Sequence, residues 1–130
     1  MRLLLDTHTL LWLVDGDARL SQRARNALAD PANELFISVA TTWELAIKTA
    51  KTPKSLILCD PLDIYLAKWL PVYAIDALPI QQPHALGVLV LPDLHRDPFD
   101  RIIIAQAICE EMTLVSGDGQ VSRYAVPLIW

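Results

Sequence analysis

One stretch of the sequence decides the fold, and it reads DPFDRIIIAQAI at residues 97–108, followed by TLV at residues 113–115. The first segment is apolar on nearly every side, which predicts a buried helix with Asp97 as its N-cap and Pro98 in its first position. The second segment is a short continuous apolar run, typical of a strand with both faces buried. A buried helix that leads into a buried strand predicts an α/β domain.

The rest of the chain repeats this alternation. Three more apolar runs predict strands, at residues 2–5, 35–39 and 126–130, and Pro127 restricts the last of them to a sheet edge. Five further segments predict helices, at residues 7–14, at 21–29 with Ser21 as N-cap, at 41–50, at 61–70 with Pro61 in the first position, and at 82–90. Alternating strands and helices imply right-handed crossovers, and therefore a three-layer α/β/α fold with a short parallel central sheet.

Length and composition agree with one folded domain. The chain has 130 residues, of which 53% are hydrophobic and 20% charged, so residues 1–130 are expected to form a single domain. The net charge of −4 argues against a protein that coats nucleic acid by bulk attraction, although a local basic patch is compatible with it. The mean hydropathy of +0.32 indicates that a partner covers some apolar surface.

The sequence predicts a soluble, cytoplasmic protein without a membrane partner. Asp6 interrupts the first apolar run, which is too short for a signal peptide, and no apolar stretch approaches the ~20 residues that cross a bilayer. Cys59 and Cys109 are too few for a disulfide framework and form no metal-binding doublet. We expect both to be buried free thiols in a reducing compartment.

Four carboxylates occupy equivalent places in the predicted sheet. Asp6 ends the first strand, and Asp118 follows the strand at 113–115 by one short turn. Glu44 lies near the start of the helix after the second strand, and Asp100 lies in the first turn of the buried helix. Because ligands of open α/β sheets bind beyond the C-terminal ends of the strands, we expect these side chains to converge there.

Each acid also has a purely structural explanation. Asp6 could cap the following helix, and Asp118 could close a turn. Glu44 forms an i, i+4 pair with Lys48, which is worth only ~0.3–0.5 kcal/mol on an exposed face. Asp100 stands at the third helical position behind the N-cap, as in a capping box.

Taken together, the four acids favour a cation site. Several carboxylates at one sheet edge repel one another, and a divalent cation removes that penalty. Mg²⁺ or Mn²⁺ is preferred because hard cations take carboxylate oxygens, water and phosphate as ligands, whereas no His/Cys set here has the spacing of a zinc site. An acidic Mg²⁺ or Mn²⁺ pocket is typical of phosphoryl chemistry.

Several short segments stand in a characteristic order and spacing. They are LLDTH at residues 4–8, SV at 38–39 leading to WELAIK at 43–48, HRDPFDR at 95–101 leading to AQA at 105–107, and LVSGD at 114–118. Together they resemble the PIN-domain nucleases, and most closely the VapC-like toxins of bacterial toxin–antitoxin systems. There are two departures: Ser116 stands where Thr is more frequent, and residues 49–54 lack the expected glycine-containing turn at the rim of the pocket.

The resemblance implies a Mg²⁺- or Mn²⁺-dependent endoribonuclease that acts as a toxin. It further implies a small antitoxin that covers the active site or an adjacent groove, and a dimer of two toxin copies. By the same resemblance Asp6, Glu44 and Asp100 match the three core acids, and Asp118 matches the fourth, more variable one. Asp97 is an extra acid on the same helical face as Asp100, and it could support the metal site or act only as the N-cap.

We expect a division of work among these acids. Asp6 and Asp100 would bind the metal directly, while Glu44 and Asp118 would hold metal-bound waters or a second ion. A metal-bound water would then attack phosphorus in line, so no side-chain nucleophile is needed.

Basic residues beside the acids could contact RNA phosphates, namely Arg96, Arg101 and Lys48. Lys51 and Lys54 continue the spacing of Lys48 and would share its stripe if the helix extends that far. A solvated, charged face is the alternative for these side chains.

The remaining polar and aromatic residues near the acids have less specific roles. Thr7 and Ser116 could orient carboxylates or waters through their hydroxyls, and Thr7 could equally serve helix entry. His8 and His95 are assigned no part in catalysis. The four tryptophans are expected to be core or interface anchors, because no basic strand accompanies them.

Two alternatives come from other functional classes. A phosphoacceptor signalling domain also has an acidic Mg²⁺ pocket, but it needs a lysine beyond a late strand, and no lysine follows Lys68. A catalytically silent PIN-like protein-interaction module is disfavoured because none of the four acids is missing. Binding of Mn²⁺ that depends on the carboxylates would separate the nuclease from the silent module.

Overall fold

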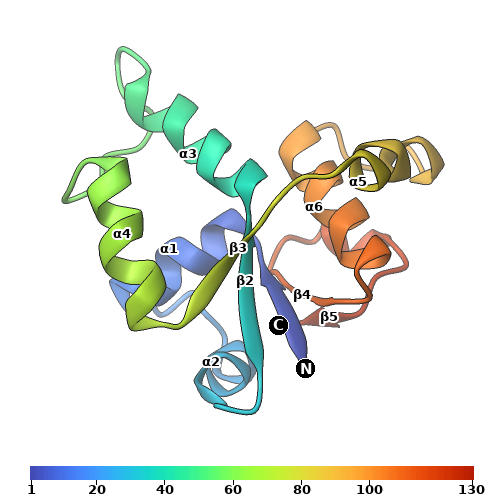
Figure 1. The fold of residues 1–130 in the computed structure, drawn as a ribbon, viewed down its shortest axis with the longest axis horizontal. Coiled ribbons are helices and arrows are strands. Elements are labelled where there is room, and N and C mark those ends of the chain that lie inside the picture. The colour runs from blue at the N-terminus through green and yellow to red at the C-terminus, as the bar shows by residue number, and fades with distance from the viewer.

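Strand β1 (Arg2–Leu5) lies at the centre of a parallel sheet (Figure 1). Its three leucines are buried, as expected of a strand covered on both faces. The computed structural model describes residues 1–130 and contains five parallel strands in the order β3-β2-β1-β4-β5. The other strands are β2 (Glu34–Ser38), β3 (Ile75–Leu78), β4 (Thr113–Val115) and β5 (Leu128–Ile129). The predicted parallel α/β sheet is therefore confirmed.

Strand β3 has no counterpart among the predicted strands. It lies at one edge of the sheet, where Asp76 and Ala77 are exposed and only Ile75 and Leu78 are buried. Such a segment lacks the continuous apolar run by which the buried strands were predicted. Strand β5 lies at the opposite edge, as Pro127 predicted.

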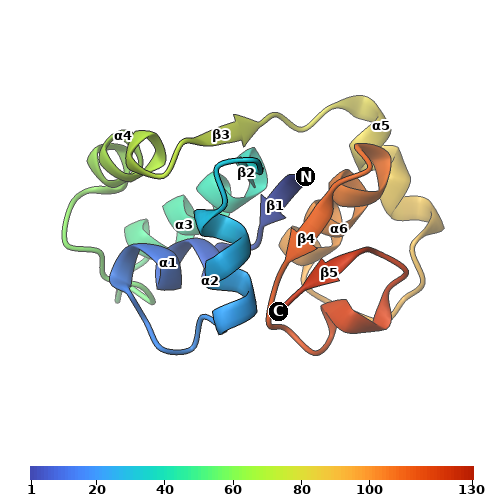
Figure 2. The ribbon, with the colours of Figure 1, turned by 90° about the horizontal axis from the view of Figure 1, so that it is seen from below.

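Helices cover both faces of the sheet and complete the three predicted layers (Figure 2). They are α1 (Thr7–Asp15), α2 (Gln22–Ala29), α3 (Val39–Ala50), α4 (Leu62–Val72), α5 (Gln82–Gly87) and α6 (Pro98–Cys109). Successive residues of β1 point to opposite faces. Leu3 and Leu5 pack in a core with α1 and α2, whereas Leu4 packs in a second core with α6.

Three predicted helix boundaries are displaced in the structure, and a capping hydrogen bond explains the first of them. Helix α3 begins at Val39 and not at Thr41, because Oγ of Ser38 accepts a hydrogen bond from the amide of Ala40 at 2.9 Å. Pro61 is the N-cap of α4 and not its first residue. The predicted helix at residues 82–90 is divided into α5 and a short 3₁₀ turn, Val88–Val90.

Both cysteines are exposed, which corrects the prediction that they are buried. Cys109 is the last residue of α6, and Cys59 precedes α4. Neither forms a disulfide. None of the helices has the length and apolar character needed to span a membrane.

The strand register brings the predicted site to one edge of the sheet. Leu5 of β1 pairs with Ile37 of β2 and with Val115 of β4. The C-terminal ends of these three strands therefore lie side by side. Helix α6 leads into β4 after a short connection, and its N-terminus therefore lies at this same edge. Acids from four separate segments are thus brought together by topology.

Candidate active site

The first turn of α6 supplies two acids with different surroundings. Oδ1 of Asp97 accepts a hydrogen bond from the amide of Phe99 at 2.9 Å, which confirms that Asp97 is the N-cap. Asp100 makes no such backbone contact. Burial, together with the charges of Asp97, Glu44 and Asp6, raises the pKa of Asp100 to about 7, although His95 acts in the opposite direction. The carboxylates of Asp6 and Glu44 are therefore close enough to act electrostatically on Asp100.

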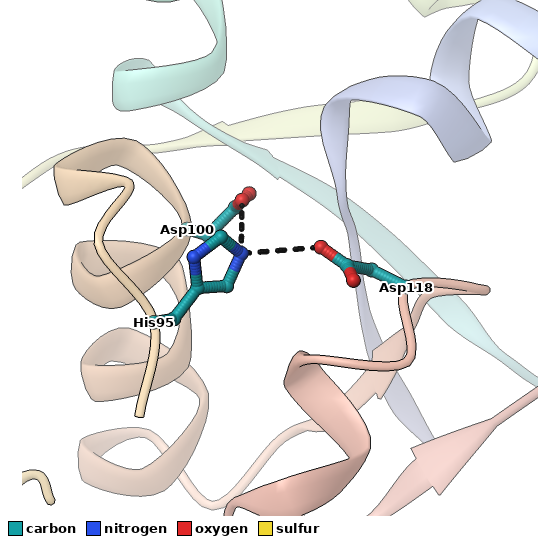
Figure 3. Close-up of side chains that lie close together, drawn as sticks. All are labelled: His95, Asp100 and Asp118. Carbon is teal, nitrogen blue, oxygen red and sulfur yellow. Dashed lines mark hydrogen bonds and ion pairs between the residues drawn. The ribbon is translucent and has the colours of Figure 1, made fainter. Parts of the chain in front are cut away.

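Asp118 reaches the site from the loop after β4 (Figure 3). Its Oδ1 accepts a hydrogen bond from the amide of Gln120 at 2.8 Å, so it closes a turn as well. Its own amide donates to Oγ of Ser116 at 3.1 Å. Its Oδ2 lies 3.2 Å from Nε2 of His95, and the same nitrogen lies 2.9 Å from Oδ2 of Asp100.

His95 is the site residue that the sequence prediction missed. It stands only five residues before Asp100, and this proximity was the available signal. Its contact with Asp118 joins residues 23 positions apart and arises only when the loop after β4 folds against α6. The sequence alone does not show that contact.

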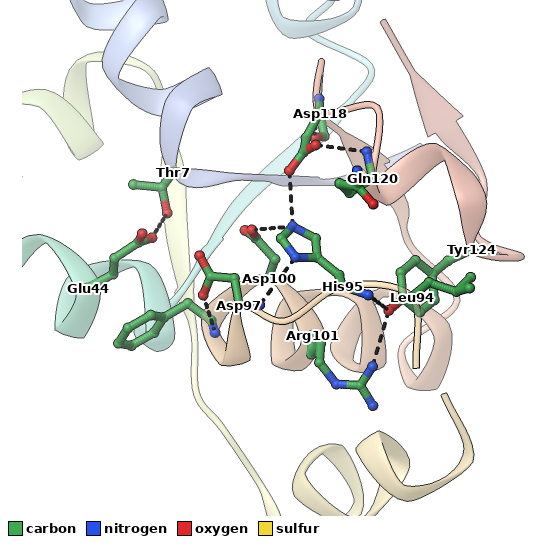
Figure 4. Close-up of polar contacts among 12 residues, drawn as sticks. Thr7, Glu44, Leu94, His95, Asp97, Asp100, Arg101, Asp118, Gln120 and Tyr124 are labelled. Carbon is green, nitrogen blue, oxygen red and sulfur yellow. Dashed lines mark hydrogen bonds and ion pairs between the residues drawn. The ribbon is translucent and has the colours of Figure 1, made fainter. Parts of the chain in front are cut away.

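Glu44 points from α3 toward the other acids and is only 6% exposed (Figure 4). The hydroxyl of Thr7 donates to its Oε1 at 2.5 Å, and Nζ of Lys48 lies 2.9 Å from its Oε2. The predicted i, i+4 pair is therefore present, but it neutralises a buried carboxylate and does not lie on an exposed face. Both oxygens of Glu44 have a partner on the protein.

Asp6 follows β1 and is 7% exposed. It caps α1, because its Oδ1 accepts a hydrogen bond from the amide of Thr9 at 2.8 Å. Burial raises the pKa of Asp6, and hydrogen bonds from Ser116 and Thr9 act in the opposite direction. Asp6 therefore caps α1 and also lies near enough to Asp100 for its charge to act on that carboxyl.

The basic residues differ in how far their charges are already engaged. Arg101 donates to the carbonyl oxygens of Pro92 and Val88 and to the hydroxyl of Tyr124, so its guanidinium holds the segment that leads to His95. Arg96 is exposed and has no hydrogen bond or ion pair within the chain. Lys48 is bound to Glu44, as described above.

Two other lysines do not join this group. Helix α3 ends at Ala50, with Lys51 as its C-cap, and Lys54 lies in the loop beyond. The helix therefore does not extend far enough for the three lysines to share a stripe. Their exposure agrees with the alternative of solvated charges.

The donor set fits a hard divalent cation. The nearby side chains offer carboxylate oxygens, which Mg²⁺ and Mn²⁺ prefer. The negative charges of neighbouring carboxylates contribute to the raised pKa of Asp100, and a bound cation would offset them. The tightest group comprises His95, Asp100 and Asp118, whose potential ligand atoms all lie within 4.8 Å of one another. Asp6 and Glu44 stand outside this tightest group.

Comparisons with known proteins agree with this architecture. The family model for the PIN domain matches residues 3–127. The chain has 20% sequence identity and a TM-score of 0.67 to VapBC2 of Rickettsia felis, solved with a DNA fragment from its promoter, over 98% of this chain and 97% of that one. No curated protein matches the sequence.

Two further solved structures show the same likeness. VapBC-1 of nontypeable Haemophilus influenzae has 17% identity and a TM-score of 0.62, over 98% of this chain and 96% of that one. A toxin–antitoxin complex of Klebsiella pneumoniae has 23% identity and a TM-score of 0.54, over 88% and 85% of the two chains. At these identities the likeness establishes a common fold.

Proposed function

Because this chain belongs to the PIN-domain family, whose members are typically nucleases, we propose that it is a divalent-metal-dependent endoribonuclease that hydrolyses RNA phosphodiester bonds. The observation that carries the proposal is the crowding of acids around Asp100. Burial and the charges of Asp97, Glu44 and Asp6 raise its pKa to about 7. Such a carboxyl is suited to a cation and destabilising without one.

Each acid has a role in this proposal. Asp6 and Asp100 bind Mg²⁺ or Mn²⁺ directly, and Glu44 and Asp118 hold water or a second ion. When bound, the cation lowers the pKa of water and neutralises charge on the phosphate oxygens. Asp97 caps α6 and adds negative charge beside Asp100.

The hydroxyls and the lysine around the acids orient them. Thr7 and Lys48 each bind one oxygen of Glu44 and so hold its carboxylate in one direction. Ser116 contacts both Asp6 and the amide of Asp118, which links the ends of β1 and β4. These contacts restrict how far the carboxylates can turn.

RNA is held by a small number of basic side chains in spite of the acidic net charge of the protein. Arg96 and His95 both line two cavities of about 650 and 310 Å³, and the charge of Arg96 is free for a phosphate. Arg101 and Lys48 already bind groups of the protein, the carbonyl oxygen of Pro92 and the carboxylate of Glu44. Each would bind an RNA phosphate only by dividing its hydrogen-bond donors between the phosphate and that partner.

The protein acts as the toxin of a toxin–antitoxin pair in the cytoplasm. A cavity of about 440 Å³ is lined by residues that include Trp12 and the two partners of Glu44, Thr7 and Lys48, and it suits a segment of the antitoxin. An exposed apolar stripe on α3, formed by Val39, Trp43 and Ile47, suits a second copy of the chain. Trp43 is 62% exposed, which agrees with an interface anchor and not with a core residue.

The proposal is tested with the purified full chain, a panel of structured and single-stranded RNAs, and added Mg²⁺, Mn²⁺ or EDTA. Wild-type protein is compared with Asp100→Asn and with Asp63→Asn. Asp63 is the matched control, because it is an exposed aspartate in the first turn of α4. Calorimetric titration with Mn²⁺ measures binding independently of cleavage.

We expect wild type and Asp63→Asn to bind Mn²⁺ and to cleave RNA in a reaction that EDTA abolishes. Asp100→Asn is expected to lose cleavage while it remains folded. Equal cleavage by Asp100→Asn and wild type would refute the role of the acids. Wild-type protein that binds no Mn²⁺ and cleaves no RNA would identify the chain as a silent interaction module.

A further inference from the structure

His95 lies between two acids that come from different elements, and the nuclease proposal assigns it no role. Its Nε2 lies 2.9 Å from Oδ2 of Asp100 on α6 and 3.2 Å from Oδ2 of Asp118 on the loop after β4 (Figure 3). The imidazole is mostly buried, with a side-chain exposure of 15%. One nitrogen therefore joins two acids of the site.

This arrangement permits two roles that require opposite states of Nε2. As a metal ligand, Nε2 must carry no proton, and the neutral ring then keeps its proton on Nδ1. As a hydrogen-bond donor to the two carboxylates, Nε2 must carry the proton, and Nδ1 is then free to accept a hydrogen bond. The partner of Nδ1 distinguishes the two.

Nδ1 of His95 has a donor as its partner. The backbone amide of Asp97 lies 3.2 Å from Nδ1 and donates a hydrogen bond to it. An amide N–H can donate only to a ring nitrogen without a proton, so Nδ1 is the acceptor and the proton of the neutral ring resides on Nε2. The protonated nitrogen therefore faces the two carboxylates.

The backbone around His95 holds the ring in this orientation. The amide of His95 donates to the hydroxyl of Tyr124 at 2.9 Å, and this hydroxyl also receives a hydrogen bond from Arg101 at 3.1 Å (Figure 4). Moving the ring proton from Nε2 to Nδ1 would place two N–H groups, those of Asp97 and of the ring, against each other. The donor arrangement is the one consistent with all of these contacts.

We propose that His95 is a positioning residue and not a metal ligand: its Nε2–H ties Asp118 to Asp100 and keeps this tautomer when a divalent cation is bound. A carboxylate oxygen accepts more than one contact, so Asp100 and Asp118 can bind a cation while they accept these hydrogen bonds. The link matters most for Asp118, which stands on a loop. The effect of His95 on metal binding rests on the proposed function, whereas the assignment of its tautomer does not.

Nitrogen NMR on the ¹⁵N-labelled full chain tests the tautomer directly. Spectra that correlate ring nitrogens with ring protons are recorded at a pH where the imidazoles are neutral, before and after saturation with diamagnetic Mg²⁺. His84 is an internal reference, because its ring makes the same kinds of contact. Its Nδ1 accepts a hydrogen bond from the backbone amide of Gln81 at 3.0 Å, and its Nε2 faces Glu110. Loss of signals in His95→Gln assigns the ring.

We expect His95 to carry its proton on Nε2 in both states. A proton on Nδ1 in the metal-free protein would overturn the proposal. So would a transfer of the proton from Nε2 to Nδ1 on addition of Mg²⁺, since that transfer is the signature of a ligating Nε2.

Two variants test the positioning role through Mn²⁺ affinity measured by calorimetry. His95→Ala removes the donor, and we expect a loss of about tenfold in affinity with unchanged stoichiometry, as for other residues that orient metal ligands. His95→Gln can offer an amide N–H in place of Nε2–H, and we expect it to recover most of the affinity. Denaturation curves establish that both variants are folded.

Two results in this series would contradict the proposal. They are an affinity in His95→Gln as low as in His95→Ala, and a wild-type affinity in His95→Ala. If wild type binds no Mn²⁺ and cleaves no RNA, the proposed function fails, and the tautomer of the metal-free protein still decides whether His95 is the donor that joins the two acids.

Discussion

The hydroxyl of Thr7 lies 2.5 Å from Oε1 of Glu44 and so connects the first turn of α1 with the middle of α3. Both residues are buried, and they are 37 positions apart in the sequence. Lys48 supplies the only other polar partner of this carboxylate, at Oε2. The contact therefore joins the strand ends of β1 and β2 through an acid of the site.

Replacing Thr7 with Val should remove this donor while keeping the shape of the side chain. A buried carboxylate oxygen is then left without a partner, which costs about 1–3 kcal/mol in the free energy of unfolding. Urea denaturation measures the loss, and Thr7→Ser is the control, because it retains the hydroxyl. Equal destabilisation by Val and Ser would show that the methyl group and not the hydrogen bond carries the effect.

The raised pKa of Asp100 predicts how the metal-free protein responds to pH. The pKa is about 7 in the native state and near the ordinary value of 3.8 in the unfolded chain. Between these values the native protein holds a proton that the unfolded chain has released, so the stability contribution of Asp100 falls as the pH rises toward 7. The melting temperature without divalent cations should therefore decrease between about pH 4 and pH 7.

Asp100→Asn should flatten this dependence, because the amide does not titrate, and it should be more stable than wild type at the upper end of the range. Added Mg²⁺ should restore stability to wild type at that end and have less effect on the variant. Asp63→Asn, which replaces an exposed aspartate in the first turn of α4, should follow the wild-type curve. Parallel curves for wild type and Asp100→Asn would mean that another group controls the response.

Asp97 allows its two contributions to be separated by substitution. Asn caps helices as well as Asp does, so Asp97→Asn should keep the hydrogen bond to the amide of Phe99 and remove only the charge. Among the neighbouring charges, that of Asp97 contributes most to the raised pKa of Asp100, which should therefore fall in this variant. Carbon NMR titration of the Asp100 carboxyl measures the change.

Asp97→Ala loses the cap as well, and we expect it to be less stable than Asp97→Asn by about 1 kcal/mol. Urea denaturation of the two variants provides that comparison. An unaltered Asp100 pKa in Asp97→Asn would show that the two carboxylates do not interact.

The central elements were predictable because burial and local chemistry agree there. The leucines of β1, the Ser21 cap of α2 and the Asp97 cap of α6 each have a local signal, and each was confirmed. Strand β3 lacked a signal of its own: it exposes Asp76 and depends on pairing with β2 for its conformation. Local pattern does not predict an edge strand of that kind.

The acids could be predicted from their places after strands and at a helix start, but their partners could not. Whether Lys48 neutralises a buried acid or an exposed one depends on which face of α3 packs inward. The contact of His95 with Asp118 depends on the path of the loop after β4. Both contacts are tertiary, and the sequence around each residue is compatible with a solvated side chain.

Gly117 packs so closely against the C-terminal Trp130 that a larger residue does not fit. A Cβ at this position would lie 2.4 Å from Cε2 of the indole, which in turn contacts Trp12 at a ring separation of 5.7 Å. Gly117→Ala should therefore lower the free energy of unfolding by about 1–3 kcal/mol. Because Asp118 is the next residue, Mn²⁺ affinity should fall as well.

Gly119→Ala is the matched control on the same loop, since its added Cβ would have no atom within 4 Å. Thermal denaturation and calorimetry of both variants separate overpacking from a general effect of alanine in the loop. Equal stability of the two variants would show that Trp130 moves aside without cost.

Arg96 is the cation beside the acids whose charge is not engaged within the chain, and this predicts how its removal affects RNA cleavage. If it binds a phosphate equally in the ground and transition states, Arg96→Ala should raise KM and leave kcat nearly unchanged. The salt dependence of kcat/KM should also become shallower, by about 0.7 in the logarithmic slope for one contact to single-stranded RNA. Arg23→Ala is the control, because Arg23 is also an exposed and unpaired arginine, on α2. A fall in kcat at constant KM would place Arg96 in transition-state stabilisation, and identical behaviour of the two variants would reduce Arg96 to part of the general surface charge.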